Sequence, residues 1–350
     1  MRTYIVPAGC TSRDELRMVD RPDPAPGPSQ VLIRVRAAAL NYRDQAVTMG
    51  TYFGGAVSRD TIPLSDGAGE VMAVGPGVSR VKPGDRVVGQ FTQIPPDGPP
   101  FGARAALGAP LDGMLAERIV LYEDGVIPIP AALSFEQAAS LPCAGVTAWH
   151  ALMHAGRPVR AGDTVLVLGT GGVSIFALQF AKAAGARVIA TSSSDEKLAR
   201  ALALGASEGV NYTRTPEWDQ EVMKLTAGRG VDCVVEVGGV GTMNRSFQAL
   251  AFSGKVVLIG VLTGAPGSPG SPGSPGSHGA INPYTLMPKR GSLHGIFVGD
   301  REMFELMNKA IETNRICPVV DKVFPFDDAA GAYRCQAAGE FFGKVVIRVA

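Results

Sequence analysis

The sequence predicts an α/β fold in which a doubly wound parallel sheet is joined to a second, β-rich domain. From about residue 164 onward, short runs of consecutive Val, Ile and Leu alternate with amphipathic helical segments. A parallel sheet that is covered by helices on both faces requires such runs. A glycine-rich turn directly follows the first run. The first third of the chain instead has short strand-like runs separated by Pro and Gly turns, which is typical of a β-rich domain.

The composition fits two domains and argues against nucleic acid as the main partner. The chain has 350 residues, of which 46% are hydrophobic, enough for a sizeable core. Its 33 Lys and Arg balance 32 Asp and Glu to a net charge of +1, whereas a polyanion partner would require a strongly basic surface.

The same sequence predicts a cytoplasmic protein without a membrane anchor. No apolar run approaches the roughly 20 residues that span a bilayer, and the N-terminus lacks the apolar core of a signal peptide. The five cysteines are scattered and odd in number, which suits free thiols in a reducing compartment.

The elements of the β-rich domain follow from local patterning. Residues 30–36 alternate partly between apolar and polar side chains after a Pro-rich lead-in. Residues 71–74 and 82–88 predict two further strands joined by turns. The Pro-, Gly- and Ala-rich stretch 95–110 predicts an irregular loop, and 135–155 is rich in helix-forming residues.

The second domain predicts alternating strands and helices. Strands are expected over 164–168, 187–191, 231–237 and 255–259, and helices over 173–184, 195–204 and 242–251. A low-complexity Gly-Ser-Pro insert within 267–277 predicts a flexible surface loop. A strand over 291–298, a helix over 302–314 and a strand over 343–349 follow. We therefore expect one domain from residues 1–130 and 295–350, and the other from residues 131–294.

A dinucleotide-binding turn is predicted at residues 169–174, which read Gly-Thr-Gly-Gly-Val-Ser. Glycines let the chain turn tightly and bring backbone N–H groups close to a pyrophosphate, and the helix N-terminus adds roughly half a positive charge. A strand before the motif and a helix after it are the context of a Rossmann domain. The candidate cofactor residues are Gly169, Gly171, Gly172 and Val173, and the alternative is a plain glycine turn.

The end of the second strand predicts NADPH in preference to NADH. An NAD enzyme commonly places Asp or Glu there to bond the ribose 2′-hydroxyl. This chain has Ser192 and Ser193, whose hydroxyls can donate to a 2′-phosphate, and Lys197 lies close enough to add a cation. The alternative is that these serines cap the next helix.

Several segments together resemble the medium-chain dehydrogenase/reductase superfamily. They are residues 35–44, 66–71, 81–87 and 141–148, together with the glycine motif. The resemblance covers nearly the whole chain and is greatest to the zinc-independent branch, the quinone and enoyl reductases and their alcohol-dehydrogenase-like relatives. It implies a GroES-like catalytic domain beside a Rossmann domain, and a homodimer.

The resemblance also implies that zinc is absent. Zinc alcohol dehydrogenases of this superfamily have Cys where this chain has Asn41 and His where it has Ser65, and only Cys143 retains a thiol at a ligand position. Catalytic zinc requires three protein ligands. Two histidines four residues apart, His150 and His154, have a metal-binding spacing, but no nearby acid completes a set, so we interpret them as surface or packing residues.

Further cofactor residues are carried over by position in the family. Lys197 and Tyr212 match a Lys and a Tyr that hold the 2′-phosphate in NADPH-using quinone reductases, and Thr147 matches a residue at the nicotinamide end. Gly260 and Val261 match backbone positions near the nicotinamide amide. Lys344 is expected to approach the cofactor from the other domain.

Without a metal, hydrogen-bond donors must stabilise the negative charge that develops on the substrate oxygen. The resemblance places Asn41, Tyr42 and Tyr52 near the nicotinamide, with Asp66 orienting a donor or bonding buried backbone. Tyr42 has core packing as its alternative, and Arg43-Asp44 is most simply a local ion pair. We expect an NADPH-dependent reductase of activated C=C bonds in small enones or quinones. The alternatives are a zinc-free alcohol dehydrogenase or carbonyl reductase, and a dinucleotide-binding protein without turnover.

Overall fold

The computed structural model describes residues 1–94, 105–262 and 281–349. The chain forms two compact units, one from Met1–Val146 with Asp300–Ala350 and the other from Thr147–Gly299. The domain limits predicted from the sequence lie at 130/131 and 294/295. The loop predicted over 95–110 is described only from residue 105 onward, and the Gly-Ser-Pro insert over 267–277 lies outside the described residues.

The second unit contains the parallel sheet that the apolar runs predict. Its six strands are β8 (Thr164–Val167), β9 (Arg187–Ser192), β10 (Glu208–Asn211), β11 (Val231–Glu236), β12 (Leu250–Leu258) and β13 (Ser292–Gly295). They lie in the order β10-β9-β8-β11-β12-β13, and every neighbouring pair is parallel. Along the sheet, the strand numbers fall from β10 to β8 and then rise from β11 to β13, so the order of connection reverses between β8 and β11. Open α/β sheets bind ligands at the carboxyl ends of the strands beside such a reversal. The predicted Rossmann fold is confirmed.

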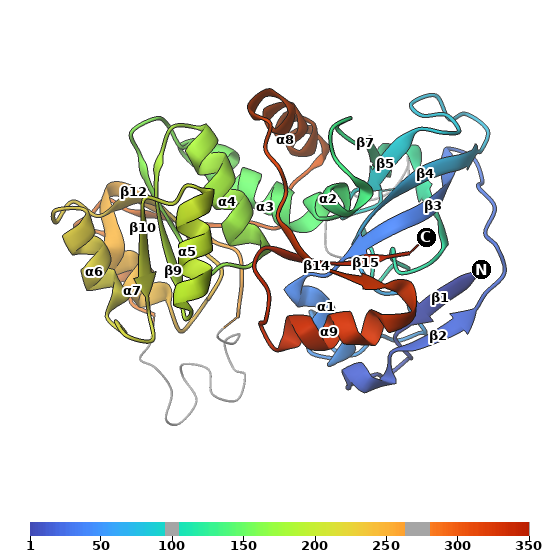
Figure 1. Cartoon of the computed structure of the whole chain (residues 1–350), viewed down its shortest axis with the longest axis horizontal. Helices are drawn as coiled ribbons and strands as arrows, with labels where there is room; N and C mark the ends of the chain where they lie inside the picture. Colours follow the sequence, from blue (N-terminus) through green and yellow to red (C-terminus); the bar gives the residue numbers. More distant parts are fainter. Residues whose placement is uncertain (95–104, 263–280, 350) are drawn as a thin grey trace. The chain divides into compact units, whose positions relative to one another are not determined.

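Four helices pack against this sheet (Figure 1). They are α4 (Gly172–Ala183), α5 (Asp195–Leu204), α6 (Trp218–Leu225) and α7 (Met243–Ala249). The core between helices and strands includes Trp218, Phe247 and Val256, all nearly inaccessible to solvent. Burying a side chain of this size contributes about 1.5–3 kcal/mol.

The sequence-based limits differ from the structure at several elements. The strands predicted over 71–74 and 82–88 lie at Asp66–Val74 and Arg86–Gly89, and the strand predicted over 255–259 begins at Leu250. The helix predicted over 242–251 ends at Ala249, because β12 begins at Leu250 without an intervening loop. The helical segment predicted over 135–155 is divided into α2 (Phe135–Ala139), the π-helical turn η4 (Leu141–Gly145), α3 (Val146–Trp149) and the π-helical turn η5 (His150–His154).

The first unit contains a mostly antiparallel sheet. Its seven strands are β3 (Gln30–Ala39), β4 (Asp66–Val74), β5 (Arg86–Gly89), β6 (Arg118–Tyr122), β7 (Val126–Pro128), β14 (Val320–Pro325) and β15 (Lys344–Arg348). A separate antiparallel pair joins β1 (Arg2–Ile5) and β2 (Arg17–Asp20). The strand β15 pairs with β3 in the register Val346↔Ala39, so the end of the chain lies beside the residues that follow β3.

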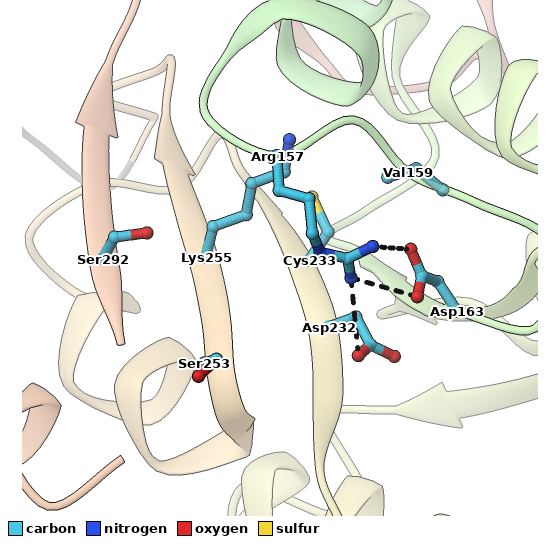
Figure 2. A pocket seen from close by; sticks show the side chains of 8 residues that line it. All are labelled: Arg157, Val159, Asp163, Asp232, Cys233, Ser253, Lys255 and Ser292. Atoms are coloured by element: carbon cyan, nitrogen blue, oxygen red, sulfur yellow. Dashed lines mark hydrogen bonds and ion pairs between the residues drawn. The ribbon is translucent and has the colours of Figure 1, made fainter. Parts of the chain in front are cut away.

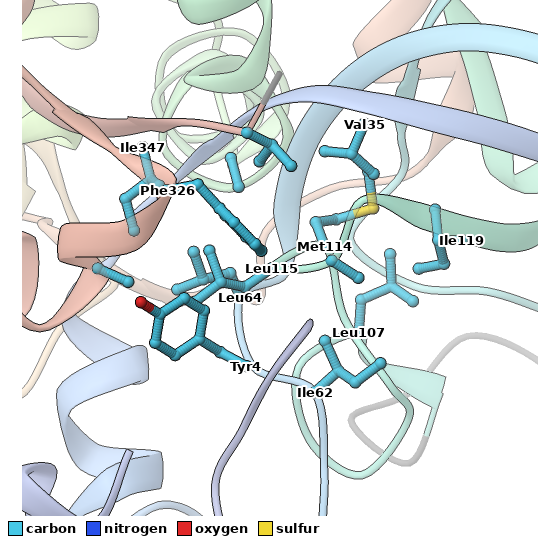
Figure 3. Close-up of a cluster of buried hydrophobic side chains, with 14 of the residues drawn as sticks. Tyr4, Val35, Ile62, Leu64, Leu107, Met114, Leu115, Ile119, Phe326 and Ile347 are labelled. Carbon is cyan, nitrogen blue, oxygen red and sulfur yellow. The ribbon is translucent and has the colours of Figure 1, made fainter. Parts of the chain in front are cut away.

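The core of this unit is drawn in Figure 3. Tyr4 and Phe326 meet edge to face with ring centroids 5.3 Å apart, a geometry that aromatic pairs prefer. Ile347 on β15 is fully buried in the same cluster. In its described residues the unit also contains α2 and the helices α1 (Tyr42–Thr48), α8 (Arg301–Asn314) and α9 (Ala329–Ala337). In the described ranges, no helix combines the length and apolar character that crossing a bilayer requires.

Candidate functional site

The glycine turn after β8 is open in the way that a phosphate-binding loop requires. Gly169 has a φ of +74°, and its N–H donates to Thr191 Oγ1 at 3.2 Å. Gly171 is the N-cap of α4, and a Cβ built on either Gly169 or Gly171 meets no atom within 4 Å. A side chain there would fill space from which backbone N–H groups can reach an anion.

Ser174, which replaces the last glycine of the motif, fits its buried position through a hydrogen bond. Its hydroxyl donates to the Leu168 carbonyl at 2.6 Å. The extra atoms that serine adds between helix and strand are therefore accommodated by this bond. Gly172 and Val173 form the half-buried first turn of α4 next to it.

The serines at the end of β9 and directly after it have different partners, and helix capping, one of the two alternatives for this segment, is present. Ser194 caps α5 by accepting the Lys197 N–H at 3.3 Å. Ser192 is buried and accepts the Ser194 N–H at 3.2 Å, whereas Ser193 is exposed. Capping therefore belongs to Ser194, and Ser192 and Ser193 remain candidates for the ribose.

A basic residue that the sequence analysis missed lies beside these serines. The Arg214 guanidinium pairs with Asp195 Oδ1 at 2.5 Å, and the same oxygen accepts from Asn211 Nδ2 at 2.8 Å. Tyr212, between Asn211 and Arg214 in sequence, is 40% exposed at the carboxyl end of β10. Arg214 thus brings a cation to the region assigned to the 2′-phosphate, and its position two residues after Tyr212 was the only signal in the sequence.

Glu236, the last residue of β11, organises the next loop and was also missed. Its carboxylate is fully buried. Oε1 accepts from the N–H groups of Gly238 and Gly239 at 2.8 and 2.9 Å and from the Thr242 hydroxyl at 2.6 Å. Oε2 accepts from the Ser246 hydroxyl. The signal available in the sequence was a carboxylate at the end of a Val-rich strand, followed by Val237 and two glycines.

The loops after β11 and β12 are packed without room for side chains. A Cβ on Gly260 would lie 2.3 Å from the Val237 carbonyl oxygen, and a Cβ on Gly239 would lie 2.9 Å from the Gly260 oxygen. Val261 follows with 40% of its surface exposed. Glu236 therefore supports a loop that in turn positions the backbone at Gly260 and Val261.

Two other residues singled out in the sequence, Thr147 and His150, also lie in this unit. Thr147 is buried on α3. His150 Nδ1 lies 2.8 Å from the Val298 carbonyl oxygen, which is a packing contact. Together, the open glycine turn, the ribose-side polar groups and the close-packed loops fit a dinucleotide along the carboxyl ends of the strands.

In the first unit, the structure brings together three predicted residues from distant parts of the sequence. Lys344 is buried, and its ammonium donates to Asn41 Oδ1 and to the Leu40 carbonyl, both at 2.6 Å. The same ammonium lies 3.8 Å from Asp66 Oδ2. Asn41, Asp66 and Lys344 thus form one buried polar cluster.

The donor set at the three family zinc positions does not fit zinc. Asp66 Oδ1 accepts from the Ser65 hydroxyl at 2.7 Å, and Oδ2 accepts from the Cys143 N–H at 3.1 Å. The oxygen of Asn41 is already bonded to an ammonium. Burial raises the pKa of the Cys143 thiol well above its usual range, and the Asp66 charge adds to this shift. A hydroxyl and an amide oxygen that is already bonded leave Cys143 as the one thiol among the three positions, whereas catalytic zinc requires three protein ligands and prefers thiolate and imidazole.

The Arg43 guanidinium contacts both the Tyr52 ring and residues from distant parts of the same unit. It lies 4.6 Å from the Tyr52 ring centroid and 4.9 Å from that of Phe91. It donates to the carbonyls of Leu107 and Ala109 at 2.8 and 3.0 Å. Burial raises the pKa of the Tyr52 phenol, and the Arg43 charge opposes that rise. Arg43 is therefore more than the local ion pair that the sequence suggests.

Tyr42 and Asp44 lie on α1 beside Arg43. Tyr42 is 52% exposed, which excludes the core-packing alternative. Asp44 is buried, accepts the Asn41 N–H at 2.7 Å and lies 3.7 Å from Arg43. Burial raises the pKa of its carboxyl to about 6, against the attraction of Arg43.

We expect Asp44→Asn to change how stability depends on pH. With a folded pKa of about 6 and an unfolded pKa near 3.9, the folded state binds more protons between these values. The free energy of unfolding therefore falls as pH rises through this window, by at most about 3 kcal/mol. The Asn variant keeps an acceptor for the Asn41 N–H but lacks this titration. Urea unfolding from pH 4 to 7 should show the difference, and parallel curves for the two proteins would contradict it.

The second unit contains a small cavity, whose lining residues are drawn in Figure 2. Its volume is about 40 Å³, and it lies near the amino ends of the strands, beside Arg157, Asp163, Asp232 and Lys255. Arg157 lies 3.0 Å from Asp163 and 3.8 Å from Asp232. Ligand pockets usually enclose about 300–1,000 Å³, so this cavity is too small for a substrate.

The cavity has a structural explanation. The Lys255 ammonium donates to the carbonyls of Ala151, Leu152 and Ala155 at 2.9, 3.3 and 2.6 Å. Cations at the last turn of a helix satisfy its free carbonyls and its negative dipole end. Lys255 therefore caps the helical segment that ends at His154.

Comparison with known proteins gives full-length similarity to dehydrogenases and reductases. A family model described as alcohol dehydrogenase GroES-like domain matches residues 27–131, and one described as zinc-binding dehydrogenase matches residues 172–313. A zinc-type alcohol dehydrogenase-like protein of Schizosaccharomyces pombe is 41% identical over 350 residues, with 99% of each chain covered.

Two further comparisons extend this result. A quinone oxidoreductase of Rattus norvegicus is 31% identical, with 93% of this chain and 90% of the relative covered. A crystal structure described as an NAD-dependent alcohol dehydrogenase has a TM-score of 0.87 at 35% identity, with 100% of both chains covered.

Proposed function

The chain belongs to the medium-chain dehydrogenase/reductase superfamily of oxidoreductases, and on this basis we propose that it is a zinc-free, NADPH-dependent reductase of activated C=C bonds in small enones or quinones. The observation that carries the proposal is the donor set of Asn41, Ser65 and Cys143, which is unsuited to zinc and includes an amide held next to an ammonium. Hydrogen-bond donors suit a delocalised enolate or quinol oxygen, whereas a localised alkoxide benefits more from a Lewis acid.

The proposed cofactor site lies at the carboxyl ends of the parallel strands. Backbone N–H groups of Gly169, Gly171, Gly172 and Val173 would hold the pyrophosphate at the start of α4. Ser192, Ser193, Lys197 and Tyr212 would hold the 2′-phosphate, and Thr147, Gly260 and Val261 would meet the nicotinamide. We leave Lys344 out of this set, because its ammonium already has acceptors on Leu40 and Asn41.

When bound, NADPH supplies a hydride to the β-carbon of the enone, and the displaced electron pair moves to the carbonyl oxygen. We propose that Asn41 donates to this oxygen, with Tyr42 and Tyr52 as further donors. In measured oxyanion holes a donor of this kind is worth about 3–4 kcal/mol. Uptake of one proton at the α-carbon then gives the saturated ketone. The Asp66 carboxylate lies 3.8 Å from the Lys344 ammonium in the same buried cluster.

The proposal is tested by oxidation of NADPH with a chelator present, against a matched quinone, enone, aldehyde and ketone. Turnover of the enone or quinone, with a saturated ketone or quinol as product, supports it. Turnover of the carbonyl compounds alone, with an allylic alcohol from the enone, would favour the second candidate, an alcohol dehydrogenase or carbonyl reductase. That candidate is favoured by the names of the Schizosaccharomyces pombe relative and of the solved structure. Cofactor binding without any turnover would favour a non-catalytic binder.

We expect Ser192→Asp to reverse the cofactor preference. A carboxylate at this position can still accept the Ser194 N–H, but it repels a 2′-phosphate and bonds a 2′-hydroxyl. Juxtaposed like charges cost several kcal/mol, so the ratio of kcat/KM for NADPH over NADH should fall by about 100-fold. Ser192→Ala is the control, since it removes the hydroxyl without adding charge. An unchanged ratio in the Asp variant would remove Ser192 from the phosphate site.

We also propose that the protein is a cytoplasmic homodimer. The edge strand β13 and the segment before it carry exposed apolar side chains, with Tyr284, Met287 and Leu293 exposed by 74%, 71% and 42%. An open strand edge with apolar neighbours is a site for pairing between chains. The cysteines, all free thiols, suit a reducing compartment. Light scattering of Leu293→Lys against the natural protein would test the dimer.

A further inference from the structure

The environment of Lys344 explains how the Asn41 side chain is oriented. The register between β15 and β3 pairs Val346 with Ala39, so position 344 lies opposite position 41 across the ladder. The Leu40 N–H donates to the Val345 carbonyl at 3.0 Å and extends this pairing beyond β3. The ammonium therefore reaches the Asn41 amide from a rigid strand, and Lys344 is only 3% exposed.

An asparagine amide has nearly the same shape in its two orientations, so its neighbours decide which end points where. An ammonium has three donors and no acceptor. Asn41 Oδ1 must therefore face Lys344, at the observed 2.6 Å, and the NH₂ group must face away.

The other end of the same amide lacks a partner. Asn41 Nδ2 is buried and has no acceptor within the described parts of the chain, and Asn41 as a whole is only 8% exposed. Leaving such a donor unpaired costs about 1–3 kcal/mol. Buried donors of this kind are usually satisfied by a ligand or by ordered water. The unpaired NH₂ is therefore held ready for an acceptor that is not part of the protein.

We propose that Lys344 is a positioning residue that fixes the Asn41 amide, so that its NH₂ group donates to the substrate oxygen that becomes negative on hydride transfer. This inference rests on the proposed function. The ammonium acts in two ways. It excludes the flipped amide, in which Oδ1 would repel the developing negative charge. It also draws electron density from Oδ1, which strengthens the N–H groups as donors in a low-dielectric site.

Asp66 keeps the ammonium in place without competing for the amide. Its carboxylate lies 3.8 Å from Lys344 Nζ, while its oxygens accept from the Ser65 hydroxyl and the Cys143 N–H. Because the carboxylate attracts the ammonium without bonding to the amide, it favours the position in which Lys344 donates to Asn41 Oδ1.

The first test compares two substitutions of Lys344. In Lys344→Gln the new side chain can donate or accept, so it no longer imposes one amide orientation. We expect kcat for the enone or quinone to fall by about 30-fold, part of the loss expected when one oxyanion donor is removed. The Kd for NADPH should stay within about twofold, since the glycine turn and the ribose site are untouched. Lys344→Arg supplies only donors, and we expect it to restore most of the turnover that the Gln variant loses.

The second test is a double-mutant cycle with Asn41→Ala. If Lys344 acts through Asn41, adding Lys344→Gln to Asn41→Ala should change kcat by less than about twofold, because the group it positions is gone. An equal loss of kcat in both backgrounds would overturn the proposal and leave the reductase function standing. Wild-type turnover in Asn41→Ala itself would instead show that Asn41 is not a donor, and would remove the part of the proposed function on which this inference rests.

Two further measurements separate positioning from stability. Lys255→Gln removes a buried lysine whose ammonium also bonds backbone carbonyls, but in the other unit. It should lower the Tm and leave kcat per folded molecule unchanged. Neutron diffraction of the deuterated natural protein needs no variant. Two deuterons on the Asn41 atom remote from Lys344 support the proposal, and two on the atom facing the ammonium would overturn it.

Discussion

Gly171→Val is expected to abolish high-affinity NADPH binding while the protein remains folded. The Cβ position at Gly171 is open to 4 Å, and its φ of −76° and ψ of 179° are accessible to valine. A Cβ at this position therefore meets no atom of the protein. The branched side chain of valine lies where, in the proposed cofactor site, the backbone approaches a pyrophosphate.

The size of this effect follows from the contacts that are lost. Each hydrogen bond to a charged group contributes about 1.5–3 kcal/mol, and loss of one or two weakens binding by about 100-fold or more. Replacing an N-cap glycine should lower stability by only about 1 kcal/mol. Fluorescence titration with NADPH and thermal unfolding measure the two quantities. Gly171→Ala is the graded control, with a smaller loss of affinity, and natural affinity in the Val variant would show that the pyrophosphate lies elsewhere.

Glu236→Ala is expected to cause the largest loss of stability among substitutions in the second unit that we consider. The carboxylate accepts from Gly238, Gly239, Thr242 and Ser246, and the alanine variant leaves these donors without it. Buried donors without partners cost about 1–3 kcal/mol each, and local rearrangement recovers part of the sum, so we expect about 4 kcal/mol. Because the loop contacts Gly260, the affinity for NADPH should fall as well.

Two controls make this prediction specific. Glu236→Gln keeps one oxygen acceptor but turns an NH₂ group toward existing donors, so its loss should be intermediate. Glu221→Ala removes a partly exposed carboxylate of the same unit, which pairs with Lys224 at 3.0 Å. Exposed pairs contribute about 0–1 kcal/mol. Urea unfolding that found equal losses for the Glu236 and Glu221 variants would mean that the Glu236 network does not stabilise the loop.

The parts of the fold and site that depend on neighbouring residues could be predicted from the sequence. The strand, the glycine turn and the helix that surround Gly169 are contiguous, so their apolar runs and glycines predict the Rossmann sheet and the open turn at the start of α4. The helix limits near Leu250 were less accurate, because helix-forming residues continue directly into β12. The family resemblance, which relies on short contiguous motifs, is confirmed by the comparisons.

The parts that depend on distant contacts could not be predicted. Asn41 and Lys344 are 303 positions apart, and no local pattern shows that an ammonium reaches an amide. The sequence therefore assigns Lys344 to the cofactor by family position alone. Arg43 similarly looks like the partner of Asp44 in the sequence, whereas the structure adds Tyr52 and two carbonyls of a distant loop. Which polar groups share a buried site is decided by tertiary packing.

The division of the first unit between two stretches of chain has a consequence for its assembly. Residues 147–299 form one uninterrupted unit with its own core, so that unit can fold as soon as it leaves the ribosome. The first unit needs β14 and β15 to complete its sheet, and these two strands are synthesised after residues 147–299. Contacts that span most of a chain form slowly, because a long loop must close first. The Asn41 amide is therefore expected to reach its final orientation only after residues 147–299 have been synthesised.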